Sequence, residues 1–200
     1  MARGTGLHGA VLPEARPKGD FTLTATDGEP WNFREETDGR ITLLFFGYTH
    51  CPNACPVQMA TLGAAYGKLP WKLQDRIEVV FVTTDPARDT LSRLDSWLDN
   101  FHESFVGLRG SRGEVNRIME SYGLPPARID TAGTAGEGYT VGHAAHVLLF
   151  TPDDSLRMMY PTGTRQKAWV EDLRTLAREG TDAVLPAGGS SPGDAAAGGG

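Results

Sequence analysis

The sequence predicts an α/β sandwich in which a mixed central β-sheet is flanked by helices, with a β-hairpin at its N-terminal end. Three observations carry this prediction. Apolar, β-branched runs alternate with stripes of apolar residues at helical spacing, which is typical of strands and helices in succession. A strong turn dipeptide separates the first two short alternating runs. Another turn joins the last two apolar runs, so they are expected to close the sheet as an antiparallel pair.

The N-terminal half begins with the predicted hairpin. Residues 21–24 alternate apolar and polar side chains, an Asp-Gly dipeptide turns the chain, and residues 31–33 resume the alternation. Residues 41–47 are almost continuously apolar, as expected for a buried central strand. Residues 57–69 then carry apolar side chains at three- and four-residue spacing, which predicts an amphipathic helix.

The middle of the chain repeats this alternation. Residues 77–82 form a second continuous β-branched run, which ends before an Asp-Pro dipeptide. Helical spacing of apolar side chains predicts helices over residues 90–101 and 111–122. The short apolar segment 105–108 between them is a candidate strand. This order favours neighbouring strands joined by helical crossovers.

The C-terminal part completes the predicted sheet. Residues 127–142 are rich in glycine and threonine and have little periodicity. A connection of this length inside a compact domain is usually functional or mobile. Residues 147–150 and 156–160 predict two strands around a Pro-Asp-Asp turn, and residues 165–179 predict the last helix.

One domain accounts for the chain. Two hundred residues, of which 40% are hydrophobic, suit a single globular domain. Residues 1–19 carry glycine, proline and scattered charge, and are expected to form an extended N-terminal arm. The domain is expected over residues 20–180, followed by a disordered, low-complexity tail over residues 181–200.

Charge and hydropathy exclude some partners. The formal net charge is −6 and no basic block stands out, which argues against a nucleic-acid partner. The longest apolar run, residues 41–48, is far shorter than the roughly 20 residues of a spanning helix. We find no signal peptide and no lipid-attachment cysteine. As given, the chain is expected to be soluble and monomeric.

The two cysteines, Cys51 and Cys55, lie together and a proline follows each of them. A disulfide closing so short a loop would stabilise the fold by only about 2 kcal/mol, so the pair favours chemistry over stability. If both residues are helical, their spacing of four places the two sulfurs on one face. Two soft sulfurs at one point can form a reversible disulfide or bind a soft metal ion.

Three segments of the chain resemble the Sco/SenC family of copper proteins, which have a thioredoxin-like fold. The segments are residues 47–56, with the pattern GYTHCPxxCP; residues 83–90, TTDPARDT; and residues 141–143, VGH, nine residues before Pro152. The similarity runs from about Phe21 to Ala177. Three motifs in the same order and at matching spacing make this resemblance far more specific than one cysteine pair.

The resemblance implies a copper-binding assembly factor for the CuA centre of cytochrome c oxidase, with Cys51, Cys55 and His143 as copper ligands. The implied partner is subunit II of the oxidase or another copper-accepting protein. The implied location is the outer face of the cytoplasmic membrane or a periplasm-like space, behind an N-terminal anchor that this chain lacks. The family often has an acid at the positions of Asn53 and Gly142, so we expect a less acidic site here.

Several other residues near the motifs could contribute to the site, with less support from the sequence. Asp85 is either a turn aspartate before proline or a residue that supports the ligands or a partner, and both interpretations stay open. His146 lies three residues after His143, which on an extended strand sends the two rings to opposite faces. We therefore expect His146 to pack or to contact a ligand. His50 is expected to shape the cysteine loop, and Met59 to lie in the core.

The alternative function is a thiol-disulfide reductase of thioredoxin type, with Cys51 and Cys55 as its redox-active pair. Two observations argue against it: dedicated oxidoreductases usually have two residues between their cysteines, and no proline stands before residues 147–150. Both roles can coexist, because metal loading requires reduced thiols. Zinc is a third interpretation, which lacks an obvious hydrolytic base. Whether the chain is an enzyme stays open, with a non-catalytic metallochaperone as the leading interpretation.

Overall fold

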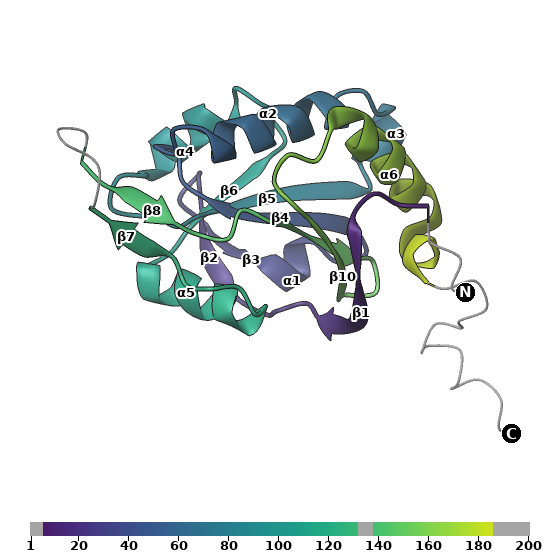
Figure 1. Ribbon diagram of the computed structural model, residues 1–200, viewed down its shortest axis with the longest axis horizontal. Helices are drawn as coiled ribbons and strands as arrows, with labels where there is room; N and C mark the ends of the chain where they lie inside the picture. The colour runs from purple at the N-terminus through teal and green to yellow at the C-terminus, as the bar shows by residue number, and fades with distance from the viewer. Residues whose placement is uncertain (1–5, 132–137, 186–200) are drawn as a thin grey trace, which may run out of the picture.

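The computed structural model describes residues 6–131 and 138–185, and the ends of the predicted arm and tail lie outside these residues. Eight strands form one sheet in the order β1-β10-β9-β4-β5-β6-β2-β3 (Figure 1). These strands are β1 (Ala10–Pro17), β2 (Thr22–Ala25), β3 (Pro30–Asn32), β4 (Ile41–Gly47), β5 (Ile77–Thr83), β6 (Val106–Arg109), β9 (Val147–Thr151) and β10 (Ser155–Tyr160). The helices are α1 (Phe33–Glu36), α2 (Ala54–Tyr66), α3 (Trp71–Gln74), α4 (Leu91–Leu98), α5 (Arg112–Ser121), α6 (Gln166–Glu179) and the 3₁₀ helix η1 (Gly180–Val184).

The centre of the sheet is mixed, which confirms the predicted fold class. Strand β4 runs parallel to β5 and antiparallel to β9, and β5 runs parallel to β6. Every residue of β4 and of β9 is buried, as the continuous apolar runs predict for strands covered on both faces. The predicted N-terminal hairpin is also present, because β2 pairs antiparallel with β3.

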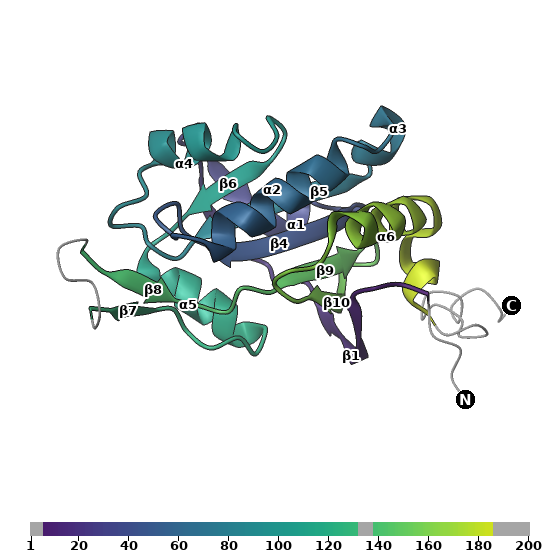
Figure 2. The same cartoon turned by 45° about the horizontal axis from the view of Figure 1, so that its top comes forward.

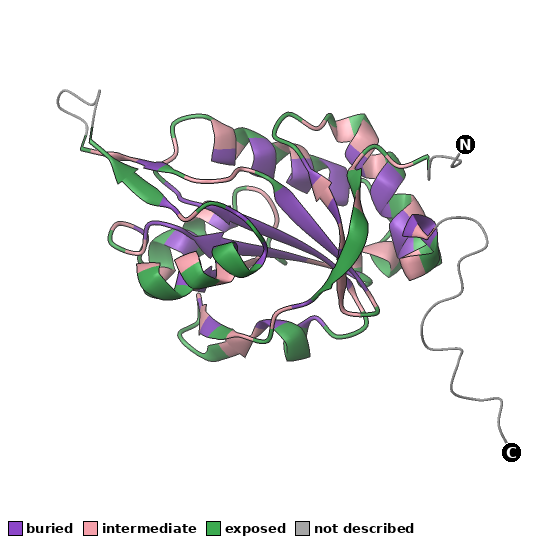
Figure 3. Cartoon of the chain, turned by 60° about the horizontal axis from the view of Figure 1, so that its bottom comes forward, coloured by how far each residue is buried: buried purple, intermediate pink, exposed green. Residues whose placement is uncertain are grey.

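Helices cover both faces of the sheet. Helices α2, α4 and α6 lie on one side, and α1 and α5 lie on the other (Figure 1). Helix α6 anchors its side through Trp169, whose fully buried ring stacks on Tyr160 with centroids 4.0 Å apart. In the described residues, no helix has both the length and the apolar character that crossing a bilayer requires. The buried residues lie in the central strands and on the helix faces that pack against the sheet (Figure 3).

The predicted N-terminal arm contains an edge strand. Strand β1 pairs antiparallel with β10, and its register is interrupted between Val11 and Arg16. Nearly all of its residues are exposed (Figure 3). An edge strand that pairs through its backbone needs no buried face, so no alternating apolar pattern marks it in the sequence.

Three short features were not predicted. The sequence pattern assigns Phe33 to a strand, but α1 begins there because the Asn32 side chain accepts hydrogen bonds from two backbone N–H groups of the first turn. Helix α3 is a single turn. Within the glycine- and threonine-rich segment, β7 (Arg128–Asp130) and β8 (Thr140–Gly142) form a separate antiparallel pair. Elements this short give hydrophobic periodicity too few residues to show.

A buried carboxylate fastens the N-terminal segment to α6. Asp172, which is 1% exposed, accepts hydrogen bonds from the backbone N–H groups of His8 (2.8 Å) and Gly9 (3.1 Å) and from the Tyr160 hydroxyl (2.8 Å). The Nδ1 atom of His8 lies 2.8 Å from the other carboxylate oxygen. The hydrogen bond to Asp172 raises the pKa of His8 above its ordinary value of 6.5, with Glu171 adding to the rise and burial and Lys167 opposing it.

We expect the N-terminal strand to loosen as the pH rises. Because the folded-state pKa of His8 is raised, the protonated ring contributes its full stabilisation below about pH 6.5 and loses it as the pH passes the raised value. Hydrogen-exchange protection of the β1 amides, corrected for intrinsic exchange, should therefore fall as the pH rises from about 6.5 through the raised pKa of His8. In His8→Gln the protection should not change with pH. Equal pH dependence in both proteins would contradict this account of the contact.

Candidate metal centre

Two loops from distant parts of the chain meet at the C-terminal end of β4. Cys51 lies in the loop between β4 and α2, Cys55 lies in the first turn of α2, and His143 directly follows β8. Figure 2 shows the start of α2 and the chain after β8 near this end of β4. The Sγ atoms of the two cysteines and one ring nitrogen of His143 all lie within 4.8 Å of one another. The structure therefore brings together the three residues that the family resemblance singles out.

The three side chains make specific contacts. The His143 Nε2 atom lies 3.4 Å from Cys55 Sγ, and the backbone N–H of Cys55 donates to Cys51 Sγ at 3.4 Å. Cys51 is half-buried and Cys55 is buried. Only Cys55 is helical, so the sulfurs meet because Cys51 occupies the loop ahead of the helix and not because both share a helix face.

Close packing beneath the site explains why a glycine precedes the cysteine loop. A Cβ atom placed on Gly47 would lie 3.0 Å from Cys55 Sγ and 2.9 Å from the ring of Phe81. The next residue, Tyr48, is buried and its ring meets the His143 ring edge-on with centroids 5.6 Å apart. Its hydroxyl accepts a hydrogen bond from the backbone N–H of Val141 at 3.3 Å. Tyr48 therefore ties the histidine segment to the cysteine loop.

The two thiols differ in acidity. A hydrogen bond from the Cys55 thiol lowers the pKa of Cys51, to about 3, with His143 and the backbone N–H groups of Cys55 and Asn53 adding to the effect against the cost of burial. The same hydrogen bond and burial raise the pKa of Cys55. The start of α2 also favours a negative charge on Cys51. At neutral pH the pair therefore holds one thiolate and one thiol.

A buried carboxylate that the sequence analysis did not weigh, Asp89, holds the cysteine loop. It is fully buried and accepts hydrogen bonds from the Thr49 backbone N–H (3.0 Å), the Thr49 hydroxyl (2.6 Å) and the Thr83 hydroxyl (2.6 Å). The Nδ1 atom of His50 lies 3.3 Å from it, in keeping with the predicted role of His50 in shaping the loop. A signal was available, because Asp89 is one of the residues of the second motif, TTDPARDT.

Asp85 supports the histidine side of the site from a distance. Its side chain is fully buried, and its Oδ1 atom accepts a hydrogen bond from the Tyr139 hydroxyl at 2.8 Å. Its Oδ2 atom accepts from Arg88 Nε at 2.5 Å. Tyr139 lies four residues before His143, so Asp85 acts on the segment that carries the histidine and does not contact the three grouped side chains.

His146 is not one of the three grouped side chains. Residues 143–146 form no strand, so the expected alternation of the two rings does not apply. Both rings line a hollow of about 580 Å³, most of whose other lining residues are apolar, including Pro125 and Met159. His146 itself is exposed. Met59 is fully buried in the core, as predicted.

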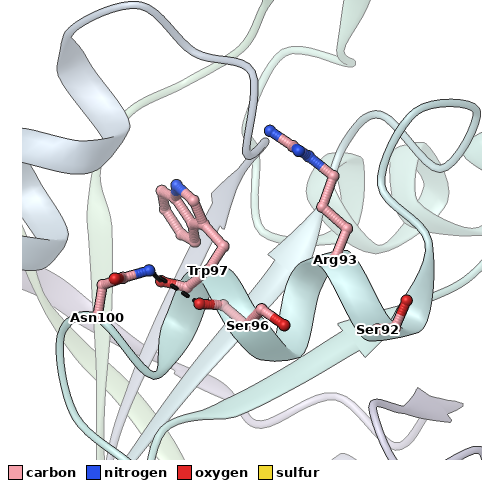
Figure 4. A pocket seen from close by; sticks show the side chains of 5 residues that line it. All are labelled: Ser92, Arg93, Ser96, Trp97 and Asn100. Atoms are coloured by element: carbon pink, nitrogen blue, oxygen red, sulfur yellow. Dashed lines mark hydrogen bonds between the residues drawn. The ribbon is translucent and has the colours of Figure 1, made fainter.

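A second hollow lies on α4, beside the cysteine loop. It measures about 440 Å³, and its lining residues are Ser92, Arg93, Ser96, Trp97 and Asn100. Arg93 and Trp97 project from the same face of the helix (Figure 4). The Arg93 Nε atom donates to the Thr49 hydroxyl at 2.7 Å. Among the described residues, this is the hydrogen bond that links the lining of the hollow to the cysteine loop.

The donor set fits a soft metal ion. A metal bound at about 2.3 Å to sulfur and about 2.0 Å to nitrogen requires ligand atoms within roughly 4 Å of one another. The separation of Cys55 Sγ and His143 Nε2, 3.4 Å, meets this requirement without rearrangement, and because all three ligand atoms lie within 4.8 Å of one another, a shift of about 1 Å or less completes the set. His143 Nδ1 is buried and has no hydrogen-bond partner among the described residues. Thiolate sulfur and imidazole nitrogen together suit copper or zinc.

Comparison with known proteins identifies relatives of this arrangement. The family model described as SCO1/SenC matches residues 10–178. The SCO1 homolog 1 of Arabidopsis thaliana mitochondria is 30% identical over 153 residues, which cover 76% of this chain. They cover 45% of that relative, so the chain spans about half of its length. The resemblance that the three motifs indicated is therefore confirmed.

Solved structures agree with the family match. The solution structure of apo Sco1 from Thermus thermophilus is 33% identical, with a TM-score of 0.73 over 88% of this chain and 98% of that one. The crystal structure of Arabidopsis thaliana ScoI with copper bound is 26% identical, with a TM-score of 0.70 over 82% and 99%. These likenesses confirm the predicted thioredoxin-like fold.

Cys51 is expected to react as a thiolate under acidic conditions. An ordinary thiol with a pKa near 8.5 loses roughly a thousandfold in alkylation rate between pH 8 and pH 5. Because the pKa of Cys51 is lowered to about 3, its rate in the reduced, metal-free protein should change less than about twofold. Mass spectrometry after pulses of iodoacetamide measures this rate at each cysteine. In Cys55→Ala the largest stabilising hydrogen bond is absent while His143 and the backbone N–H groups remain, so the rate at Cys51 should fall more steeply with decreasing pH than in the unmodified protein. The same pH dependence in both proteins would contradict this account.

Replacing Asp89 should destabilise the cysteine loop. Asp89→Ala leaves the Thr49 N–H and two hydroxyl groups without their acceptor, at a cost of about 1–3 kcal/mol for each group that stays buried and unpaired. Asp89→Asn retains one acceptor oxygen and should lose less. Urea unfolding measures both changes. Asp95→Ala on the exposed face of α4 is the control and should change the free energy of unfolding by less than about 0.5 kcal/mol.

Proposed function

The chain belongs to the SCO1/SenC family, and from this premise we propose that it binds copper through Cys51, Cys55 and His143 and passes it to another protein. The observation that carries the proposal is the approach of one imidazole and two sulfurs to within 4.8 Å. The copper-bound structure of a relative that is 26% identical supports the choice of metal. Copper is the cargo of this site and not a resident cofactor.

The donor set accounts for binding in two oxidation states. Thiolate sulfur favours Cu(I), and imidazole nitrogen binds both Cu(I) and Cu(II). Cys51 is already a thiolate at neutral pH, whereas the pKa of Cys55 is raised by its hydrogen bond to Cys51 and by burial. Copper binding therefore displaces the proton of Cys55, so the affinity should fall as the pH falls.

Transfer requires that the metal can be reached. Cys51 and His143 are both partly exposed, and His143 lies on an irregular segment between β8 and β9. Only Cys55 is fully buried. An acceptor can thus approach from the side of Cys51 and His143 while Cys55 stays anchored in α2. This asymmetry supports a carrier more than a permanent structural metal site.

The finer assignments follow from the family resemblance. The acceptor is the CuA centre of cytochrome c oxidase subunit II or another copper-accepting protein. The place of action is the outer face of the cytoplasmic membrane or a periplasm-like space. Gly142 stands where relatives often have an acid, and its Cα lies opposite Arg128 in the β7–β8 pair. The ligand set does not depend on that acid.

Removal of the imidazole is the direct test. His143→Ala should weaken Cu(II) binding by more than about 100-fold, because even residues that only support a ligand are worth about 10–100-fold. The sulfur-to-copper absorption of the Cu(II) form should also disappear or shift. Titration of the reduced protein, followed by visible absorption, measures both. His146→Ala is the matched control and should bind copper as the unmodified protein does; a normal spectrum and affinity in His143→Ala would reject the assignment.

A second candidate is a thiol-disulfide reductase of thioredoxin type. The difference between the two thiols favours it: Cys51 is partly exposed and has a lowered pKa, as an attacking thiolate needs, and the buried Cys55 could resolve a mixed disulfide. Turnover with a model disulfide separates the two functions. Rapid turnover that persists in His143→Ala would favour the reductase, and slow turnover by the unmodified protein would favour the carrier.

A further inference from the structure

Three arginines converge on the loop that follows β5. Arg88 belongs to this loop, Arg109 is the last residue of β6, and Arg112 is the first residue of α5. We call these three residues the arginine cluster. They come from three separate elements, so the fold and not local sequence brings them together. The chain as a whole carries a net charge of −6, which makes this concentration of positive charge unusual for the molecule.

The contacts within the cluster centre on residues 85 and 86. Arg88 Nε lies 2.5 Å from one oxygen of Asp85, and Arg112 Nη2 lies 3.9 Å from the other. Arg109 Nη2 donates to the Pro86 carbonyl oxygen at 2.9 Å. Among the described residues, Asp85 is the carboxylate that pairs with Arg88 and Arg112, and Arg109 has no ion pair. One buried carboxylate is thus shared by two guanidinium groups beside a third.

Each arginine also keeps a nitrogen without a partner. Arg88 Nη2, Arg109 Nε and Arg112 Nε are buried and form no hydrogen bond with the part of the chain that the structure describes. A buried donor without an acceptor costs about 1–3 kcal/mol, more when it is charged. Three such donors show that Asp85 and the Pro86 carbonyl do not use the full hydrogen-bonding capacity of the cluster, and the exposed parts of Arg88 and Arg112 offer further donors to an incoming acceptor. The planar guanidinium fork matches a carboxylate, which accepts two parallel hydrogen bonds.

The arginine cluster adjoins the candidate metal centre. The guanidinium carbon of Arg88 lies 3.7 Å from the centre of the Tyr139 ring and 5.8 Å from that of Tyr48. Tyr48 in turn contacts the His143 ring. The side chains of Arg88 and Arg112 are 22% and 37% exposed, so a group from solvent can reach them. An anion bound here would sit beside the segment that presents His143.

We propose that the arginine cluster binds a carboxylate side chain in an acidic segment of the protein that exchanges copper with this chain. This inference rests on the proposed function and adds the chemistry of the partner. The negative net charge opposes approach of a nucleic acid, whereas a short acidic segment experiences mainly the local positive charge within a Debye length of about 10 Å. Docking at the cluster sets the acceptor next to His143 and raises the rate of encounter.

An acidic peptide tests the inference without copper. The probe is a fluorescein-labelled hexaglutamate peptide, and fluorescence anisotropy measures its binding to the reduced, metal-free protein at low ionic strength. The double variant Arg109→Gln/Arg112→Gln removes two guanidinium groups and leaves the Asp85–Arg88 pair intact. Its affinity for the peptide should be at least tenfold lower. The control, Arg174→Gln/Arg178→Gln, removes the same charge from the exposed face of α6 and should change the affinity less than twofold.

Several results would overturn the inference. The first is that the peptide does not bind to the unmodified protein. The second is that its affinity falls equally in both double variants. The third is that an equal concentration of inorganic phosphate displaces the peptide, which would indicate a site for small anions. The variant Arg109→Lys/Arg112→Lys keeps both positive charges but removes the planar guanidinium groups, and its affinity for the peptide should be severalfold lower. It supplies the test if Arg109→Gln/Arg112→Gln does not fold. Copper titrations of the same proteins are a separate readout: loss of copper binding by the unmodified protein would defeat the proposed function, whatever the peptide result.

Discussion

The 3.4 Å approach of His143 Nε2 to Cys55 Sγ is the contact on which the proposed chemistry depends. The two residues are 88 positions apart in the sequence. Antiparallel pairing of β4 with β9 brings the cysteine loop after β4 and the His143 segment before β9 to the same end of the sheet. Strand pairing alone sets the position of the two side chains only approximately. Tyr48 and Tyr139 complete the placement, because each holds the β8 segment to the body of the domain by a hydrogen bond. The position of the imidazole is therefore a property of the whole fold.

Two buried carboxylates position different parts of the site. Asp89 holds the cysteine loop through Thr49, and Asp85 holds the histidine segment through Tyr139. Both lie just after β5, at the same end of the sheet as the start of α2. Negative charge buried behind the site and the open N-terminal turn of α2 act in opposite directions on the thiols. The hydrogen bond from the Cys55 thiol to Cys51 has the larger effect: it lowers the pKa of Cys51 and raises that of Cys55, which leaves an accessible thiolate at Cys51 and a protonated, anchored thiol at Cys55.

Hydrophobic periodicity predicted the elements that build the core, because seven-residue strands such as β4 and longer helices such as α6 have enough residues to show it. It missed α1 and β1, since a one-turn helix depends on a single cap and an exposed edge strand needs no apolar face. The family motifs singled out the three grouped side chains before any geometry was known. Asp89 lies within the second motif, but its burial and its hydrogen bonds to Thr49 appear only in the folded chain. The arginine cluster was missed because its three members come from separate elements that only the fold brings together.

X-ray absorption spectroscopy of the Cu(I)-loaded protein, compared with His143→Ala loaded in the same way, tests the central claim most directly. The account predicts two sulfur ligands and one imidazole in the unmodified protein, with the imidazole scattering absent from the variant and both sulfurs retained. Identical spectra with no imidazole contribution in either protein would show that His143 does not bind copper, and would contradict the account.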